Sequence, residues 1–334
     1  MIYLDNAATT KPKPEVIKTI NYALCEQWGN PSSLYKFGQS ARVIVDEARK
    51  TVANFIGVKP SEIIFTSGAC ESNSMAILGL LLRDFTSEFI TSSIEHKSIH
   101  NLQEAWGCYD PISVNSEGYI EFTELEKILK TLYKRNKTSV VSIQYANSEI
   151  GTIQNIKEIS KIVHKYGGIF HTDATQMIAN SPVNVKDLNI DMMSFSGQKI
   201  GAPKGIGVLY VKNGIELEPI IYGSQEGGRR GGTENVPYIV GLSAAIKSIQ
   251  YPTYEIRDYF WEKLSDQVRD IYVIGSMEHR LNNNLAVCFK GVEAESLQIL
   301  LDEKGVCVSS GSACMSGKKS YVGLLLALIQ LKKK

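Results

Sequence analysis

The sequence predicts an α/β fold, with a large domain whose mostly parallel sheet is covered by helices on both faces, and a smaller α+β domain. Short apolar runs alternate with amphipathic stretches between residues 38 and 211. Turns rich in Ser and Gly follow two of these runs, and the pattern changes near residue 250, where we expect a domain boundary. Strands separated by helices are typical of parallel sheets buried on both faces.

The helix predictions rest on apolar residues that recur every three or four positions. In Gly38–Ile56, for example, Ala41, Ile44, Val45 and Ala48 share one face. The other predicted helices of this region run through Met75–Leu82, His96–Trp106, Thr123–Tyr133 and Asn155–Tyr166. The predicted strands are the apolar runs Ile63–Thr66, Glu88–Ser92, Ser139–Tyr145, Gly168–Thr172, Asp191–Phe195 and Ile206–Val211.

Beyond residue 250 the elements become shorter and more mixed. Arg257–Asp270 and Glu293–Glu303 have helical patterns, and Asn284–Phe289 and Val306–Ser309 have strand patterns. The apolar run Leu324–Ile329 has the length of a core helix and is far below the ~20 residues that a membrane-spanning helix needs.

The composition narrows the function classes. The chain has 334 residues, of which 43% are hydrophobic and 21% charged, so it can bury a core and is neither disordered nor fibrous. The net charge of +1 gives no electrostatic case for binding nucleic acid or a membrane surface. The N-terminus lacks signal-peptide features, and the six cysteines form no C-x-x-C pair. We therefore expect a cytoplasmic protein with reduced thiols, without disulfides or a metal site.

A lysine and an acid follow two of the predicted strands. Lys199 lies in a Ser/Gly-rich turn directly after a strand, and Asp173 ends the strand before it. Each alone has an ordinary interpretation, as a surface lysine or a turn former. Together, at the carboxyl end of a parallel sheet, they suit pyridoxal phosphate, because a lysine holds that cofactor as a Schiff base and a carboxylate keeps its ring nitrogen protonated.

Three further segments fit the same site, and each has a simpler alternative. The segment Thr66–Asn73, which runs from a strand through a turn into a helix, suits an anion, or is a plain helix cap. His96 could lie on a cofactor ring and move protons, or cap a helix. Cys314 lies in a run of small residues that suits a mobile loop, or is a buried thiol, which is the role we expect for the other five cysteines.

Several motifs follow one another in a fixed order across residues 2 to about 328, and together they are specific for one family. They resemble the cysteine desulfurases of the NifS/IscS type, in the class V aminotransferase family of fold-type-I pyridoxal-phosphate enzymes. SSGSAC points to the branch with a long mobile cysteine loop. The motifs are YLDNAATT at Tyr3, GNPSS at Gly29, TSGACES at Thr66, IEHK at Ile94, NSEIG at Asn147, HTDATQ at His171, SFSGQK at Ser194, GGTENVP at Gly231 and SSGSAC at Ser309.

The resemblance implies the cofactor site. Lys199 would carry pyridoxal 5'-phosphate, Asp173 would pair with the pyridine nitrogen, Gln176 would bond the phenolic oxygen, and His96 would stack on the ring. Asn147 and Ser148 would stand beside a cofactor oxygen. The residues implied around the phosphate are Gly68, Ala69, Cys70, Ser196 and Gln198, with Thr233 reaching the partner subunit's site in a homodimer.

The resemblance also implies the reaction. L-cysteine and the thiol of Cys314 would give L-alanine and a persulfide on Cys314. The sulfur would pass to an acceptor or scaffold protein for iron–sulfur cluster, thio-cofactor or tRNA synthesis.

The implied domains are a large cofactor-binding domain over 14–250 and a small domain formed by 1–13 and 251–334. The small domain is C-terminally shortened relative to the family and lacks the segment with the substrate-binding Arg. Arg230 is the substitute that we expect.

Several substitutions leave alternatives open. Gln198 stands for a family histidine, Cys70 for a threonine, Ser148 for an asparagine and Gly227 for an arginine. With the shortened C-terminus, they leave open a catalytically impaired or non-catalytic cofactor-binding paralogue. Another class V activity, such as a selenocysteine lyase or an aminotransferase, also stays open at this point.

Overall fold

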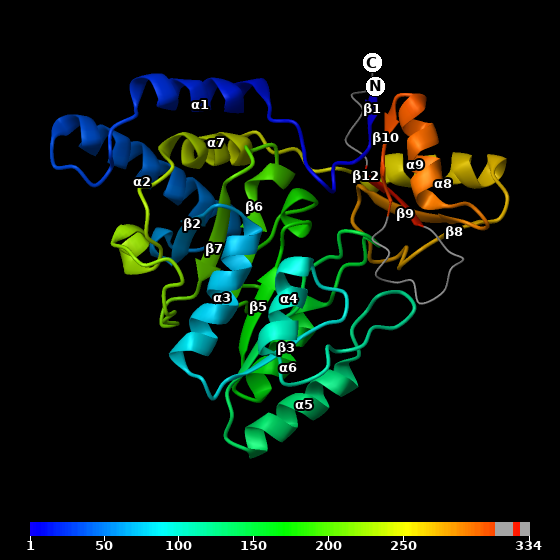
Figure 1. The fold of residues 1–334 in the computed structure, drawn as a ribbon, viewed down its shortest axis with the longest axis horizontal. Helices are drawn as coiled ribbons and strands as arrows, with labels where there is room; N and C mark the ends of the chain where they lie inside the picture. The colour runs from blue at the N-terminus through cyan, green and yellow to red at the C-terminus, as the bar shows by residue number, and fades with distance from the viewer. Residues whose placement is uncertain (311–322, 328–334) are drawn as a thin grey trace.

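The computed structural model describes residues 1–310 and the backbone of residues 323–327 (Figure 1). Its largest element is a six-stranded sheet. The spatial order is β2 (Ile63–Thr66), β7 (Gly207–Val211), β6 (Met192–Ser196), β5 (Ile169–Asp173), β4 (Ser139–Ser142) and β3 (Glu88–Thr91). Strands β3 to β6 are parallel neighbours, whereas β7 is antiparallel to both β6 and β2. The predicted mostly parallel α/β sheet is confirmed, with β7 as its reversed strand.

Helices cover both faces of this sheet because the strands alternate their apolar side chains. Ile63 and Phe65 face one core, and Ile64 faces the other. The second face is covered by α3 (Ala69–Arg83) and α4 (Lys97–Trp106). The first is covered by α2 (Lys36–Ile56), α5 (Phe122–Lys134), α6 (Ile156–Lys165) and α7 (Val236–Lys247), with α1 (Pro14–Glu26) packed beside α7 (Figure 1).

A second, smaller sheet lies beside the first, on the right of Figure 1. Its antiparallel order is β11 (Ser309–Ser310), β12 (Gly323–Ala327), β9 (Asn284–Phe289) and β8 (Ile271–Val273). Helices α8 (Tyr254–Gln267) and α9 (Ala294–Glu303) contribute side chains to its core. The N-terminal strand β1 (Ile2–Tyr3) pairs in parallel with β10 (Val306–Cys307), so the two ends of the described chain meet here.

Short 3-10 turns occur at four places along the described chain: Pro60–Glu62, Met177–Ala179, Gly197–Lys199 and Gln225–Gly228. No described helix is long and apolar enough to cross a membrane. Within the same residues, no group of three or more His, Cys, Asp or Glu side chains is arranged to hold a metal ion.

Two predictions for the C-terminal part are wrong. Part of Leu324–Ile329, expected to be a core helix, belongs to strand β12, because β9 and β11 offer its backbone partners on both sides. The single strand expected at Val306–Ser309 is two short strands, β10 and β11, which join different sheets. Helix α7 was not predicted, because it is apolar nearly all round and lacks an amphipathic pattern.

The expectation of buried free thiols is also wrong for three cysteines. Cys25, Cys70 and Cys108 are exposed, whereas Cys288 is buried and Cys307 is half-buried. Cys25 lies in the surface helix α1, and Cys70 lines a cavity described below. Cys314 lies outside the described residues.

A buried ion pair joins α2 to the segment that follows β7. Arg49 donates from both terminal nitrogens to Glu226, at 2.8 and 2.7 Å. Glu226 also accepts the Phe65 N–H of β2 at 3.1 Å. Its backbone is held at φ 51°, in the left-handed region that side chains other than glycine rarely adopt. The pair therefore holds a strained turn against the edge strand of the sheet.

We expect Arg49→Met to lower the free energy of unfolding by about 3–5 kcal/mol, because it leaves the buried Glu226 carboxylate unpaired. The matched control is Lys50→Met, one residue further along α2, where the exposed pair with Glu47 should contribute little. Urea denaturation of both variants measures the difference. Equal stabilities for the two variants would contradict the structural role of the Arg49–Glu226 pair.

Candidate active site

The carboxyl ends of β2, β3, β4, β5 and β6 share one edge of the large sheet, where ligands bind in open α/β folds. Because β7 runs the opposite way, its first residue lies at the same edge. A cavity of about 610 Å³ opens there. The predicted site residues that line it are Gly68, Ala69, Cys70, His96, Ser148, Asp173, Gln176, Ser196, Gln198 and Lys199.

The turn after β2 is pressed against β7. Thr66 and Ser196 both pair with Gly207, one from each side. A Cβ on Gly207 would lie 2.5 Å from the Gly68 backbone, so only glycine permits this approach. Helix α3 starts at Ala69, and its free N–H groups face the turn as a ready anion site.

An ion pair closes the same turn from behind. Glu71 accepts the Ser67 N–H at 2.7 Å, and Arg230 donates to both Glu71 oxygens at 2.7 and 3.2 Å. Burial would raise the pKa of Glu71, but the bonds from Arg230 and Ser67 outweigh it and lower the pKa. The Arg230 guanidinium is therefore committed to Glu71, and Arg230 is not among the residues that line the Lys199 cavity. The expected role in binding the substrate carboxylate gains no support from this placement.

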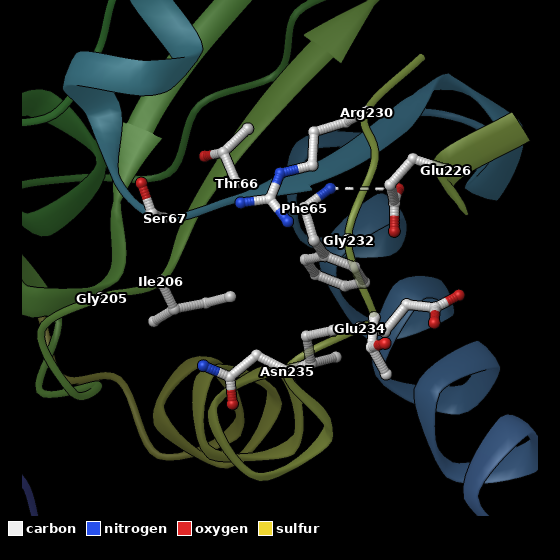
Figure 2. A pocket seen from close by; sticks show the side chains of 12 residues that line it. Phe65, Thr66, Ser67, Gly205, Ile206, Glu226, Arg230, Gly232, Glu234 and Asn235 are labelled. Atoms are coloured by element: carbon white, nitrogen blue, oxygen red, sulfur yellow. Dashed lines mark hydrogen bonds between the residues drawn. The ribbon is translucent and has the colours of Figure 1, made fainter. Parts of the chain in front are cut away.

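Arg230 and Thr233 line a second, smaller cavity of about 250 Å³. Figure 2 shows Arg230 extended toward Thr66 and Ser67, with Asn235 on the opposite side. Ser67 lines both cavities, so the two are neighbours across the turn. The role expected for Thr233 involves a partner subunit and stays a prediction.

Lys199 lies in the 3-10 turn directly after β6, and its amine is held by backbone oxygens. Nζ donates to the Ala8 carbonyl at 2.6 Å and also to that of Ala7. Burial lowers the pKa of Lys199, against the charges of Asp173, Asp5 and Cys70. A lower pKa increases the neutral fraction of the amine, which is the nucleophilic form.

The N-terminal segment forms one wall of the cavity, and no role for it was predicted. Gln176 donates from Nε2 to the Ala7 carbonyl at 3.1 Å. Thr10 donates from its N–H and its hydroxyl to the Gln198 carbonyl, at 3.1 and 2.7 Å. Leu4 donates to the Cys307 carbonyl at 2.9 Å, which ties the segment to the small sheet. The motif Tyr3–Thr10 marked this segment in the sequence, but the motif alone does not indicate that the segment lines a cavity.

Asp173 ends β5 with both carboxylate oxygens bonded. Oδ1 accepts the Thr175 N–H at 2.9 Å, and Oδ2 accepts from Asn73 Nδ2 at 2.8 Å. Two residues earlier, His171 lies between the hydroxyls of Ser142 and Ser194, each 2.8 Å from a ring nitrogen. Burial lowers the pKa of His171 to about 4, so this imidazole is neutral at neutral pH, two residues before Asp173 in β5.

His96 has the capping role that its sequence context offered, and its expected contact with a cofactor ring stays a prediction. It caps α4, since Nδ1 accepts the Ser98 N–H at 3.2 Å, and it also lines the cavity. His96 is exposed and reaches the cavity from the loop after β3.

Glu95 joins the loops that follow β3 and β4. Its two oxygens accept the Gln144 N–H at 2.9 and 3.0 Å, and Ser92 Oγ donates to Oε1 at 2.5 Å. Burial raises the pKa of Glu95 to about 8; the bonds from Ser92 and Gln144 oppose that rise, and the charge of Asp173 adds to it. Glu95 therefore stays protonated in the folded chain at neutral pH.

Asn147 shapes a turn and is not among the residues that line the cavity. Its Oδ1 accepts the N–H groups of Glu149 and Ile150 at 2.8 Å each, and Nδ2 donates to the Ile94 carbonyl at 2.9 Å. Both polar atoms of the Asn147 amide are thus bonded within the protein. The neighbouring Ser148 does line the cavity, as expected.

The sequence patterns predicted no individual role for a further group of lining residues, most of which are small or lie in loops, although Ser67 and Glu71 belong to the predicted anion-binding turn. The residues of this group are Ala7, Ala8, Ser67, Glu71, Gln144, Ala146, Glu149, Thr175, Gly205, Ser309 and Ser310.

The chemistry of the lining groups fits pyridoxal phosphate. A helix start with free N–H groups suits the phosphate, and a buried carboxylate suits a protonated ring nitrogen. A lysine with a lowered pKa suits the aldehyde. The volume of about 610 Å³ leaves room for a cofactor and a small amino acid.

Known proteins resemble this chain over nearly its full length. Residues 2–327 match the family model "Aminotransferase class-V". A relative named "Cysteine desulfurase IscS", from Dictyoglomus turgidum, is 42% identical over 342 residues, covering 98% of this chain and 85% of its own. A solved "NIFS-LIKE PROTEIN" has a TM-score of 0.91 at 31% identity, covering 98% and 93% of the two chains. "SspA in complex with cysteine" has a TM-score of 0.86 at 30% identity, covering 98% and 99%.

The buried Glu95 predicts a pH-dependent stability difference. Its folded pKa of about 8 lies above the unfolded value of 4.5, so the wild type loses stability relative to Glu95→Gln as pH rises between these values. At about 1.4 kcal/mol per pKa unit, the loss should reach a few kcal/mol. Urea denaturation from about pH 5 to about pH 8.5 measures it. The control is Glu104→Gln, which changes an exposed residue of α4. If the free energies of unfolding of Glu95→Gln and the wild type changed with pH in parallel, the raised pKa of Glu95 would be refuted.

Proposed function

This chain belongs to the class V aminotransferase family and is a cysteine desulfurase of the NifS/IscS type, and from that premise we propose how its own residues divide the work. Enzymes of this family depend on pyridoxal phosphate. The reaction converts L-cysteine and an enzyme thiol into L-alanine and an enzyme persulfide. The convergence of Lys199, Asp173 and His96 on one cavity is the observation that supports this division.

Four groups of residues would hold the cofactor. The α3 start at Gly68–Cys70, with Ser196 and Gln198, would bind the phosphate, and Asp173 would face the ring nitrogen. Gln176 and His96 would contact the ring. When bound, pyridoxal phosphate supplies an electron sink for the substrate α-carbon.

Lys199 and His96 would move the protons of the reaction. The Ala7 and Ala8 carbonyls hold the Lys199 amine at the carboxyl end of β6. Its lowered pKa increases the fraction of neutral amine, which is the form that can accept a proton. His96 reaches the cavity from the loop after β3, so the two groups approach from different strands.

Cys314 would take the sulfur, and it lies outside the described residues. Its thiolate attacks the substrate sulfur, so an S–S bond forms and the substrate C–S bond breaks. The electron pair of that C–S bond stays on carbon, which is protonated to give alanine. Ser309 and Ser310 line the cavity five and four residues before Cys314, respectively. The sulfur would then pass to an acceptor or scaffold protein, from a homodimer in the cytoplasm.

Reduction with borohydride should fix the cofactor on Lys199, because it is the lysine that lines the cavity among the described residues. Peptide mapping locates the label. Lys199→Ala should lose the covalent label, whereas the matched control Lys204→Ala, on an exposed lysine five residues later, should keep it. A label on any lysine other than Lys199 would contradict the assignment.

Brief exposure of the wild type to L-cysteine should add one sulfur to the peptide that contains Cys314. Cys314→Ser should release no sulfur, because a hydroxyl is a poor sulfur acceptor at neutral pH, and Cys307→Ser should behave like the wild type. Mass spectrometry and alanine quantification measure the two outcomes. An added sulfur on Cys307 instead would overturn the role of Cys314.

A further inference from the structure

A hydrogen-bonded chain runs behind the cavity wall from Asp173 to His96. Asn73, in α3, is fully buried and donates from Nδ2 to Asp173 Oδ2 at 2.8 Å and to Ser98 Oγ at 3.0 Å. Ser98 Oγ in turn lies 2.8 Å from His96 Nδ1. Asp173 and His96 line the cavity, whereas the two residues between them are not among its lining residues. The four side chains come from α3, β5 and the start of α4.

Asp173 determines which way the Asn73 amide points. An ionised carboxylate can only accept hydrogen bonds, so it requires the NH₂ group of the amide. A flipped amide would place Oδ1 against Asp173 Oδ2 at the same 2.8 Å, oxygen against oxygen. The orientation leaves Asn73 Oδ1 without a hydrogen-bond partner among the described residues. A buried oxygen without a hydrogen-bond partner costs free energy, and the hydrogen bonds that Asn73 donates to Asp173 and Ser98 offset that cost.

The amide in turn determines the direction of the Ser98 hydroxyl. Ser98 Oγ accepts from Asn73, so its own proton is free to point to His96 Nδ1. The Ser98 backbone N–H also donates to His96 Nδ1, at 3.2 Å. A ring nitrogen that faces two donors serves as an acceptor, and the proton of the neutral imidazole then lies on Nε2.

We propose that Asn73 is a positioning residue that couples Asp173 to His96 and, through Ser98, holds the neutral His96 ring in the Nε2–H tautomer. Asp173 and His96 are thus the two ends of one chain of hydrogen bonds whose donors and acceptors have a fixed order. The functional part rests on the proposed function: His96 then enters each turnover as a hydrogen-bond donor to the cavity, and the Lys199 amine is the group able to accept a proton.

The tautomer can be read directly, without turnover. In long-range ¹H–¹⁵N spectra of the full chain with ¹⁵N-labelled histidine, His96 is assigned by its loss in His96→Gln. The expected wild-type pattern is a protonated Nε2 and an unprotonated Nδ1. Asn73→Ala and Ser98→Ala should each move both resonances toward an average of the two tautomers, and the double variant should add little, because both break the same chain. Ser98→Ala removes one hydroxyl and keeps the test available if Asn73→Ala folds poorly.

The control is Ser72→Ala, which deletes a buried hydrogen-bonding group one residue away on α3, outside the chain of bonds. It should leave the His96 resonances unmoved. Protonated Nδ1 in the wild type would overturn the tautomer, and His96 signals unmoved in both Asn73→Ala and Ser98→Ala would overturn the coupling. In parallel assays we expect kcat to fall roughly tenfold in Asn73→Ala with KM little changed, since Asn73 is not among the residues that line the cavity. Alanine formation by the wild type tests the proposed function separately.

Discussion

The site depends on one constraint, the hydrogen-bonded register of β5, β6, β7 and β2. Asp173 lies opposite Ser194, and Ser196 lies opposite Gly207, which also lies opposite Thr66. A slip of one residue would turn every side chain of a strand to the other face, and both faces here are buried against helices. The register therefore holds the acid, the lysine turn and the anion-binding turn at fixed separations. The bare Cα of Gly207 lets the last of these come close enough to share one cavity.

Two largely buried ion pairs brace this arrangement. Arg49 with Glu226, and Arg230 with Glu71, tie the segment after β7 to β2 and to the start of α3. Buried pairs of this kind contribute modestly to net stability, but removing one partner is costly. Their effect is to make the turn at Ser67–Cys70 rigid before any ligand arrives, which lowers the entropy lost on binding.

The sequence predicted the large domain well where strands are short, apolar and bounded by turns, as at Ile63–Thr66, and where helices are amphipathic, as at Gly38–Ile56. The prediction failed where pairing with a distant strand decides whether a segment forms a helix or a strand. An isolated run such as Leu324–Ile329 has no period to distinguish helix from strand, and its pairing with β9 comes from elsewhere in the chain. At the site, charged and aromatic residues were recognisable, but Asn147 and Arg230 show the limit: no pattern indicates that an amide or a guanidinium is already used by a neighbour.

Translation makes residues 2–8 about 300 residues before some of their partners. Ile2 donates to the Gly305 carbonyl at 2.7 Å, and the contact between Asp5 and Ser309 closes a loop of 304 residues. At ~5–20 residues per second, about 15–60 s separate the two ends on the ribosome. During that time the large sheet and Lys199 have already emerged, while the N-terminal wall is still unanchored at its far end. A nascent chain therefore presents its cavity open on that side, and access to Lys199 is widest before Gly305 and the residues after it are made.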